Sequence, residues 1–469
     1  MEPAQEQSGS SMPANSLDIK NDGKEAVLVS GSLWQAIWTM SWPLLLLMIS
    51  NAIVGVVDVQ LAQLFGASAQ AAVGVADQIV FLFIAIILAA SIGTNALVSR
   101  ALGAMDEKQA IASHGQSLLF ALITGTILTI CSILFSGNLM QLFTPDTSVS
   151  QLAKPYLIIY ALYFLPFSFL CIVNAGFRAS GDAKTPLLIV LTMTTLNVVG
   201  DYWFVYGPLH NFGIKGLAIA GFISSVIGAL LAWQKLHTSI LKDSISKLLP
   251  PDYPLIMKLV KISLPAALQR MTWTFSVFAL FFTLRHCSNP TAALAAWTIG
   301  IRVESFLFMP MFALGQAVSS IVGQNLGAKE NERAFKAGWN VTWLGFFVML
   351  ICGILLFINA PLLANVMTQD SSSREYTIAY LQILAFAQPL QAMAMILNGV
   401  LQGAGDTKFP MWITIATHWL IRQPLAWILA ITCNLGPNGV WIAMATSVSG
   451  TGLLCFWRFQ SRAWEKLKL

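Results

Sequence analysis

The sequence ALGAMDEKQAIASHG at residues 101–115 occurs a second time, in modified form, as NLGAKENERAFKAGW at residues 325–339. A second pair joins RASGDAKTPLLI at 178–189 with QGAGDTKFPMWI at 402–413. Matching positions in both pairs lie 224 residues apart, so the chain consists of two copies of one module, each about half its length. Repeats of this size in an apolar chain indicate a transporter whose two halves move against each other.

The composition places this repeat in a membrane. Apolar residues make up 56% of the chain and charged residues only 10%, with a mean hydropathy of +0.70. A soluble domain carries about 25% charged residues, and about 20 consecutive apolar residues cross a bilayer. The apolar runs predict an all-α membrane protein with twelve transmembrane helices near 33–64, 70–99, 115–143, 151–177, 185–206, 213–236, 256–285, 291–325, 335–362, 374–402, 409–433 and 438–460.

The twelve predicted helices form two six-helix bundles. Because six is an even number, both halves enter the membrane in the same direction, and a pseudo-two-fold axis along the membrane normal relates them. The polar residues 1–31 predict a disordered cytoplasmic tail without the features of a cleaved signal peptide. We expect an N-lobe at 32–237 (helices 1–6), a cytoplasmic linker at 238–254 and a C-lobe at 255–469 (helices 7–12).

Lysine and arginine positions predict the orientation. With a cytoplasmic N-terminus, 19 of the 26 lysines and arginines fall in inner loops and tails, four in outer loops and three within spans. We therefore expect the protein in the inner membrane of the cell, with both termini in the cytoplasm. The net charge of +5 is explained by this bias, so no nucleic-acid partner is expected. No metal-ligand spacing appears among the six cysteines and five histidines, and we expect neither a metal nor a cofactor.

Ionisable residues inside predicted spans are the candidate functional residues, because each costs roughly 2.5–3.5 kcal/mol to insert. The first half holds Asp58 in helix 1 and Asp201 in helix 5, with Asp77 expected to be solvated near the outer surface. Phenylalanine, proline and leucine occupy the positions that match Asp58 and Asp201 in the second half. An ion-coupling site would therefore be confined to the N-lobe.

Helix 5 places Asn197 and Asp201 on one face, since they are four residues apart. Helix 4 contributes Tyr156 and Asn174, and Asp58 can meet this group from helix 1. Burial raises the pKa of a carboxyl group toward neutrality, which suits proton binding. Carboxylate and amide oxygens also suit sodium, so the residues leave H⁺ and Na⁺ both open.

The second half holds a different set of buried charges. Glu304 in helix 8 is expected to pair with Arg270 of helix 7 or Arg422 of helix 11. His418 and Arg422 share a helix face and could line a cavity in the C-lobe; an ordinary packing or gating contact explains them equally well. A membrane-embedded enzyme would need these groups to converge on one pocket, and the sequence contains no recognisable catalytic residues.

The chain resembles the MATE (multidrug and toxic compound extrusion) transporters over about residues 30–462. The resemblance rests on the repeat with its LGA and GD loops, on WPLLLLMISNAIVGVVDVQLAQLFG at 42–66 and on LNVVGDYWFVYG at 196–207. It implies that an N-lobe cavity is lined by residues that match the family's motif, and that helix 1 bends at a proline. The matching cavity residues are Asp58, Asn197, Asp201, Tyr156 and Asn174, and the matching proline is Pro43.

One departure from the family pattern bears on the coupling ion. The NorM branch carries a glutamate in helix 7 that is associated with sodium, whereas this chain has Gln269 and Arg270 there. The difference favours the DinF-like branch and proton coupling in the N-lobe.

The resemblance implies a secondary active multidrug efflux transporter, a cation antiporter that works by alternating access. Its substrates would be small, lipophilic and cationic or amphiphilic, and we expect a monomer in the bilayer. An alternative from the same superfamily is a lipid-linked oligosaccharide flippase, which predicts a strongly cationic central cavity and often extra helices. Only three arginines lie within predicted spans here.

Overall fold

The computed structural model describes residues 28–144, 146–208 and 212–467, and all regular structure in these ranges is helical. The first half contains α2 (Leu33–Gln63), α3 (Ala67–Gly103), α4 (Glu107–Leu134), α5 (Ser136–Phe143), α6 (Thr147–Ala161), α7 (Phe164–Ala179), α8 (Lys184–Tyr206) and α9 (Lys215–Leu236). The second half contains α10 (Tyr253–Arg285), α11 (Pro290–Gly327), α12 (Asn331–Met367), α13 (Ser371–Gly403), α14 (Lys408–Ile415), α15 (Gln423–Trp427) and α16 (Pro437–Gln460).

By length and composition, nine helices of the described chain can cross a membrane, or ten if the bent pair α6 and α7 is one span. Two further segments are long enough to cross but are less apolar or interrupted. They are α10, with 33 residues, and the continuous stretch 408–432, where π-helical turns at Ala416–Arg422 (η3) and Ile428–Thr432 (η4) flank α15. With these two, the layout agrees with the twelve predicted spans in two bundles.

The fourth predicted helix is broken, which the hydrophobic pattern did not reveal. The chain bends by 46° between α6 and α7. Leu162 and Tyr163 donate to carbonyls three residues earlier, so the helix tightens at its end. Pro166 follows in the first turn of α7 and cannot donate to residue 162, which removes the hydrogen bond that would continue the helix.

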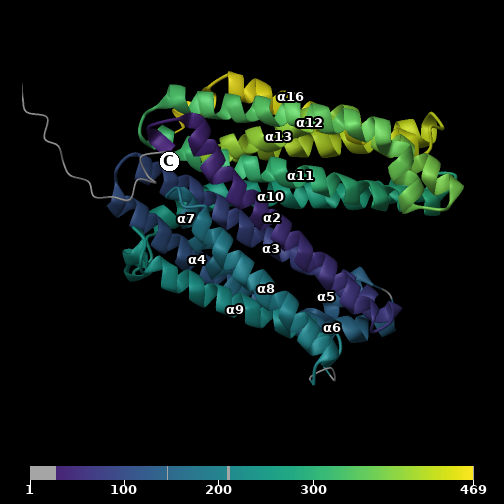
Figure 1. Cartoon of the computed structure of the whole chain (residues 1–469), viewed down its shortest axis with the longest axis horizontal. Helices are drawn as coiled ribbons and strands as arrows, with labels where there is room; N and C mark the ends of the chain where they lie inside the picture. Colours follow the sequence, from purple (N-terminus) through teal and green to yellow (C-terminus); the bar gives the residue numbers. More distant parts are fainter. Residues whose placement is uncertain (1–27, 145, 209–211, 468–469) are drawn as a thin grey trace, which may run out of the picture.

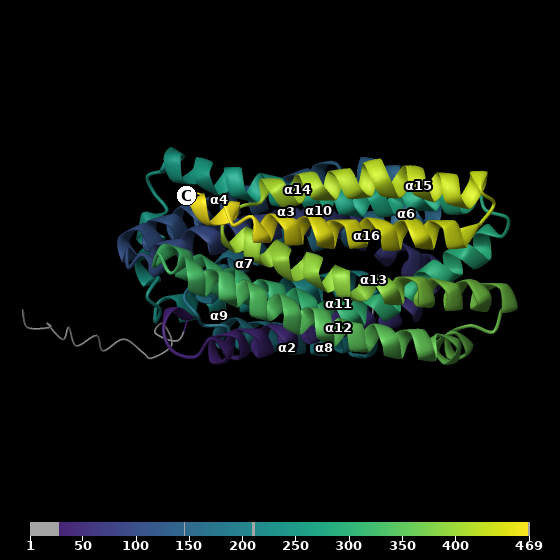
Figure 2. The same cartoon turned by 90° about the horizontal axis from the view of Figure 1, so that it is seen from above.

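Figure 1 shows the two bundles close together at the end that carries the C-terminus and far apart at the end that carries α5 and α6. In the view from above, both bundles run lengthwise in the same direction (Figure 2). The helices of the two bundles therefore meet at one end and diverge toward the other.

The first helix of each half crosses from one bundle to the other. The start of α2 places Ala36, Met40 and Leu44 in a core formed with α11, α12 and α13, while Leu61 lies in the core of the first bundle. In the same way α10 begins against α3, where Ala266 contacts this helix, and ends inside the second bundle. Each lobe is thus completed by a helix from the other half of the sequence.

The predicted tail and linker are partly ordered. Residues 1–27 of the predicted tail lie outside the described residues, but Leu28 is buried and its carbonyl accepts a hydrogen bond from Asn325 Nδ2 at 3.0 Å. The linker forms a short 3-10 helix at Lys242–Lys247 (η2) that docks on α4. Its Ser244 hydroxyl lies 2.9 Å from His114 Nδ1, and Gln116 bonds to the backbone of Lys247.

Candidate ion-coupling and substrate site

The carboxyl groups of Asp58 and Asp201 lie directly against each other in the N-lobe. Asp58 comes from the last third of α2 and is half-buried, while Asp201 comes from α8 and has no exposed surface. Asn197, one turn before Asp201, is buried on the same face of α8. The structure therefore brings helices 1 and 5 together at the residues that the sequence singled out.

This contact lacks a hydrogen-bond donor. Among the described residues, none donates to Oδ1 of Asp58 or to either oxygen of Asp201. Two ionised carboxylates are acceptors only, and they repel each other at contact distance. A proton on one of them provides the missing donor, so the arrangement suits a pair of carboxyl groups that share a proton.

Asp77 is a third member of this acidic cluster. It lies on α3, is half-buried and is close enough to Asp58 to repel its negative charge. Part of its surface stays exposed, so the expectation that Asp77 is solvated stays a prediction, while its proximity to Asp58 was not foreseen. Apolar residues of α2 and α6 pack against this part of α3, which brings Asp77 toward Asp58.

Aromatic residues form the wall behind the carboxylates. Tyr156 and Tyr160 of α6 lie near all three aspartates, and Tyr156 is 1% exposed. Their ring centroids are 5.8 Å apart, and the row continues through Tyr163 to Phe167, with centroid separations of 5.2 and 4.7 Å. Tyr160 and Tyr163 were missed from the sequence, although their spacing from Tyr156 follows one helical face.

Asn174 lies apart from the carboxylates. It is five residues from the end of α7, whereas Asp201 is 17 residues from the start of α8, and a short loop joins these two ends. At 1.5 Å per residue the two side chains differ by about 18 Å in height. Asn174 is buried with no partner for its Oδ1 among the described residues, and the prediction that it meets the carboxylates was wrong for this structure.

Pro43 stands inside the continuous helix α2. A proline at this position has no N–H to donate to the carbonyl of Thr39, one turn earlier. The missing bond weakens the helix 15 residues before Asp58, between the segment that packs on the C-lobe and the segment that carries the carboxylate. Bending at Pro43 stays a prediction.

In the C-lobe, neutral donors surround the single buried glutamate. Glu304 of α11 is 4% exposed; its Oε2 accepts from Tyr380 Oη at 2.9 Å and its Oε1 from Gln388 Nε2 at 3.2 Å, both on α13. The expected ion pair with Arg270 or Arg422 is absent from the salt bridges of the described residues. Glu304 faces α13, where Tyr380 and Gln388 are two helical turns apart and flank it.

The predicted cationic residues of the C-lobe have different partners and do not form one cluster. Arg422 lies near enough to Glu304 to balance its charge, and its Nε donates to Ser447 of α16 at 2.7 Å. His418 lies 3.1 Å from the hydroxyl of Thr417. Arg270 instead stacks over the ring of Phe312, with the guanidinium 5.4 Å from the ring centroid. Arg422 thus influences Glu304 through its charge without a direct ion pair, and Arg270 contacts Phe312 instead.

The closed end is sealed by reciprocal contacts between α3 and α11. A Cβ atom on Gly103 would lie 1.9 Å from the carbonyl oxygen of Gln324, and one on Gly327 would lie 2.1 Å from that of Arg100. Gly103 matches Gly327 in the repeat and Arg100 matches Gln324, so these two contacts are images of each other. Only glycine permits this close approach of the two backbones.

Polar bonds continue the seal toward the middle of the molecule. Asn95 Nδ2 donates to Ser319 Oγ at 3.1 Å, and Ser320 Oγ donates to Asn95 Oδ1 at 2.8 Å. Asn95 and Ser319 are themselves 224 residues apart, so the pseudo-two-fold axis passes between them. Within the described chain, His, Cys, Asp and Glu side chains do not gather in groups of three that could hold a metal ion.

These features define a two-lobed membrane transporter that is sealed at one end. The sequence profile of the MatE family matches residues 43–203 and 265–428, one segment in each half. The chain therefore belongs to the MATE family, whose members are transporters and not enzymes.

Relatives match along nearly the whole chain. The probable multidrug resistance protein NorM of Thermotoga maritima is 27% identical over 418 residues, which cover 88% of this chain and 89% of the relative. The probable multidrug resistance protein YoeA of Bacillus subtilis is 25% identical over 448 residues, covering 93% and 96%.

Solved structures share the fold. The outward-facing conformation of a multidrug resistance MATE family transporter superposes with a TM-score of 0.88 at 22% identity, covering 95% of this chain and 99% of that one. A MATE structure in the bent conformation gives 0.87 at 22% identity, with coverage of 94% and 97%.

Proposed function

We propose that this protein is a secondary active efflux transporter for small lipophilic organic compounds, cationic or amphiphilic, and that it exchanges them for protons at Asp58 and Asp201. The observation that carries the proposal is the contact between these two carboxyl groups, to which no described residue supplies a hydrogen-bond donor at Oδ1 of Asp58 or at either oxygen of Asp201. The names of the relatives, which are multidrug resistance proteins, support the substrate class.

In the proposed cycle, the cleft opens to the outside and the seal at Gly103 and Gly327 closes the cytoplasmic side. A proton from outside enters the Asp58–Asp201 pair and removes its charge. A cationic substrate held by that charge is then released, while α2 adjusts at Pro43. The lobes rock to the inward-open state, which breaks the seal between α3 and α11, and the proton leaves to the cytoplasm.

The orientation in this cycle follows the lysine and arginine bias, which predicts that both termini and the linker lie in the cytoplasm. The closed end carries the described C-terminal part of the chain (Figure 1), so the structure would be outward-open in an inner membrane. One chain contains both lobes, which supports a monomer.

The driving force is sufficient for efflux. One charge moving across 100 mV supplies about 2.3 kcal/mol, and one pH unit supplies about 1.4 kcal/mol. Together they sustain a gradient of several hundredfold for a neutral substrate, since a decade costs about 1.4 kcal/mol. A cationic substrate moves outward against the potential, so one proton would sustain less.

The side chains at the site favour protons over sodium as the coupling ion. Sodium, a hard cation, needs several oxygen ligands, and the ligand set loses one predicted member because Asn174 lies about 18 Å in height from Asp201. A carboxyl pair in contact needs only one shared proton to become stable. In the C-lobe, Tyr380 and Gln388 already occupy both oxygens of Glu304, which argues against a second sodium site there.

The oligosaccharide flippase is not favoured. A cationic central cavity would need free guanidinium groups, whereas Arg270 stacks on Phe312 and Arg422 is held by Ser447.

Transport by the purified protein in proteoliposomes tests the proposal. Uptake or release of a fluorescent lipophilic cation is measured under a pH gradient alone and under a sodium gradient alone. We expect transport with the pH gradient and none with sodium. Equal transport under sodium at uniform pH would refute proton coupling, and absence of transport under both gradients would refute the efflux function.

A further inference from the structure

We propose that Arg302 of α11 and Asp77 of α3 form an ion pair that closes the outer side of the protein when the lobes rock to the inward-open state. The seal between the lobes already joins these two helices near their cytoplasmic ends. The inference rests on the proposed alternation of the two lobes, and it depends neither on the substrate nor on the coupling ion.

The seal fixes the faces that α3 and α11 turn toward each other. Asn95 of α3 donates to Ser319 of α11 and accepts from Ser320. Residues 18 positions apart on a helix project in the same direction, because 18 residues make five turns, and they lie about 27 Å apart along the axis. Asp77 precedes Asn95 by 18 residues, and Arg302 precedes Ser320 by 18 residues. Both side chains therefore lie on facing surfaces, at the same height above the seal.

The exposed surface of each helix follows the same face. Along α11, Thr298, Arg302 and Phe306 are exposed at intervals of four residues, and along α3 Gln78 is exposed beside the half-buried Asp77. Gln78 and Arg302 are 224 residues apart, which is the spacing of the repeat, so they occupy image positions in the two lobes. The bundles diverge toward this end (Figure 1), and the ion pairs of the described residues do not include Asp77 with Arg302.

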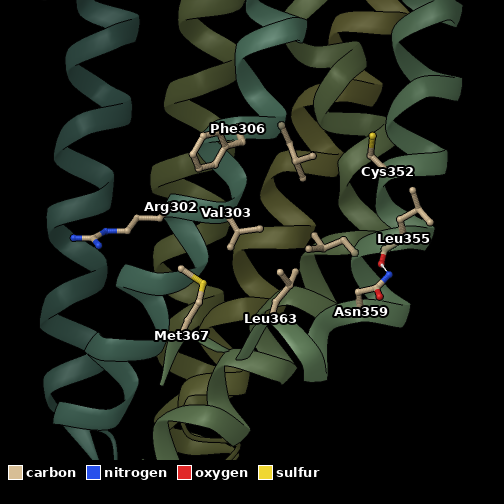
Figure 3. Close-up of a pocket in the computed structure, with 10 residues that line it drawn as sticks. Arg302, Val303, Phe306, Cys352, Leu355, Asn359, Leu363 and Met367 are labelled. Atoms are coloured by element: carbon tan, nitrogen blue, oxygen red, sulfur yellow. Dashed lines mark hydrogen bonds between the residues drawn. The ribbon is translucent and has the colours of Figure 1, made fainter. Parts of the chain in front are cut away.

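Arg302 has no ion pair with the part of the chain that the structure describes. Figure 3 shows its guanidinium extending away from the apolar pocket between α11 and α12, so the lining of that pocket does not bind it. Glu304, two residues further along α11, faces α13, where Tyr380 and Gln388 donate to it. An arginine within a membrane span is costly and normally pairs with another group. A carboxylate that reaches Arg302 in a second conformation would therefore stabilise that conformation.

The acidic cluster of the N-lobe contains such a carboxylate. Asp77 is the single acidic residue of α3, and Arg302 is the single basic residue of α11. Asp77 lies close enough to Asp58 for their negative charges to repel each other. The approach of Arg302 would relieve this repulsion, and a guanidinium can bind a carboxylate through two parallel hydrogen bonds. Charge would thus close the outer side, whereas glycine contacts close the cytoplasmic side.

The fraction of inward-open protein in detergent tests the proposal. It is measured as the rate at which a maleimide labels Ser99→Cys, a seal position without exposed surface, after the six native cysteines are replaced by alanine. We expect Arg302→Gln to lower this rate about fivefold, which corresponds to about 1 kcal/mol, and Arg302→Lys to restore part of it. Arg285→Gln, which removes an exposed arginine at the outer end of α10, should leave the rate unchanged.

Cross-linking tests the geometry directly. Asp77→Cys and Arg302→Cys, combined in the same cysteine-free protein, should be joined by a short bifunctional maleimide. Asp77→Cys and Asn359→Cys should not be joined, because Asn359 lies on α12, on the side away from the Arg302 guanidinium (Figure 3).

Absence of the cross-link between positions 77 and 302 would overturn the proposal. An unchanged labelling rate in Arg302→Gln would also overturn it, as would an equal decrease in Arg285→Gln. Asp77→Asn combined with Arg302→Gln should lower the rate no further than either change alone, since both remove one contact; additive decreases would contradict the pair. Neither measurement uses a substrate or an ion gradient, so failure of this ion pair and failure of the proposed efflux function are separate results.

Discussion

The two lobes arise from one repeated sequence but differ in whether hydrogen-bond donors and cations compensate their buried carboxyl groups. The N-lobe gathers Asp58, Asp77 and Asp201 without a cation or a donor on the Asp58–Asp201 contact, whereas the C-lobe surrounds Glu304 with two donors and a nearby arginine. Buried charge that is fully compensated costs little to keep and has no reason to change. Buried charge that is left uncompensated is stabilised when it binds a cation, which supports the proposal that coupling takes place in the N-lobe.

The sharpest test of this difference compares Asp201→Asn with Glu304→Gln. We expect Asp201→Asn and Asp58→Asn to lower proton-driven transport by at least about 100-fold, because an amide cannot carry the exchanged proton. Glu304→Gln should lower it by less than about fivefold. Rates in proteoliposomes at matched protein content check this, and equal losses in both lobes would contradict the contrast.

Removing one charge should lower the stability of the protein in the C-lobe and raise it in the N-lobe. Arg422→Met leaves Glu304 without its compensating charge and should destabilise the protein by about 3 kcal/mol, with much of the loss recovered in the double variant Arg422→Met, Glu304→Gln. Asp201→Asn removes an uncompensated buried acid and should raise stability by about 1 kcal/mol. Thermal unfolding in detergent measures both changes. An additive double variant would show that Glu304 and Arg422 do not interact.

The seal between the lobes offers a test of their symmetry. Gly103→Ala and Gly327→Ala each place a methyl group against a backbone carbonyl, so both should push α3 and α11 apart and favour the inward-open state to a similar degree. The rate at which cysteines introduced in the cytoplasmic ends of these helices are labelled should rise several-fold. A tenfold change in the population of the inward-open state corresponds to about 1.4 kcal/mol. Gly55→Ala, at a glycine with open space around its Cβ position, is the matched control.

The smallest expected effect concerns the aromatic wall. Tyr156→Phe keeps the ring but removes the hydroxyl beside the aspartates, and we expect a loss of transport of about two- to tenfold, the size of one hydrogen bond. Tyr380→Phe should change transport less, and should lower stability instead, since its hydroxyl donates to Glu304. A larger transport defect in Tyr380→Phe than in Tyr156→Phe would give the C-lobe a role in coupling.

Most of the helices could be predicted, because long apolar runs in a membrane have few structural alternatives. The predicted helix near 33–64 and the observed α2 agree within one residue at each end, and the helix near 185–206 and α8 agree equally well. The break before Pro166 and the π-helical turns at Ala416–Arg422 were missed. Neither alters hydropathy, since both depend on where single backbone hydrogen bonds are lost or shifted.

The site was predicted in part. The meeting of Asp58 with Asp201 follows from spacing within helices and from the family motif. The partners of Glu304 did not follow, because Tyr380 and Gln388 are 76 and 84 residues away in sequence and only packing brings α11 and α13 together. The proximity of Asp77 to Asp58 was not predicted for the same reason, since it depends on how α2 packs against α3.

The exchange of first helices between the lobes has a consequence for biosynthesis. Ala36, Met40 and Leu44 of α2 find their packing surface on helices that the ribosome has not yet made when α2 enters the bilayer. This apolar face of α2 must therefore contact lipid until α11 and α12 are inserted. Assembly of the two modules is an interdependent late step, and neither half of the chain contains all the residues of its own core.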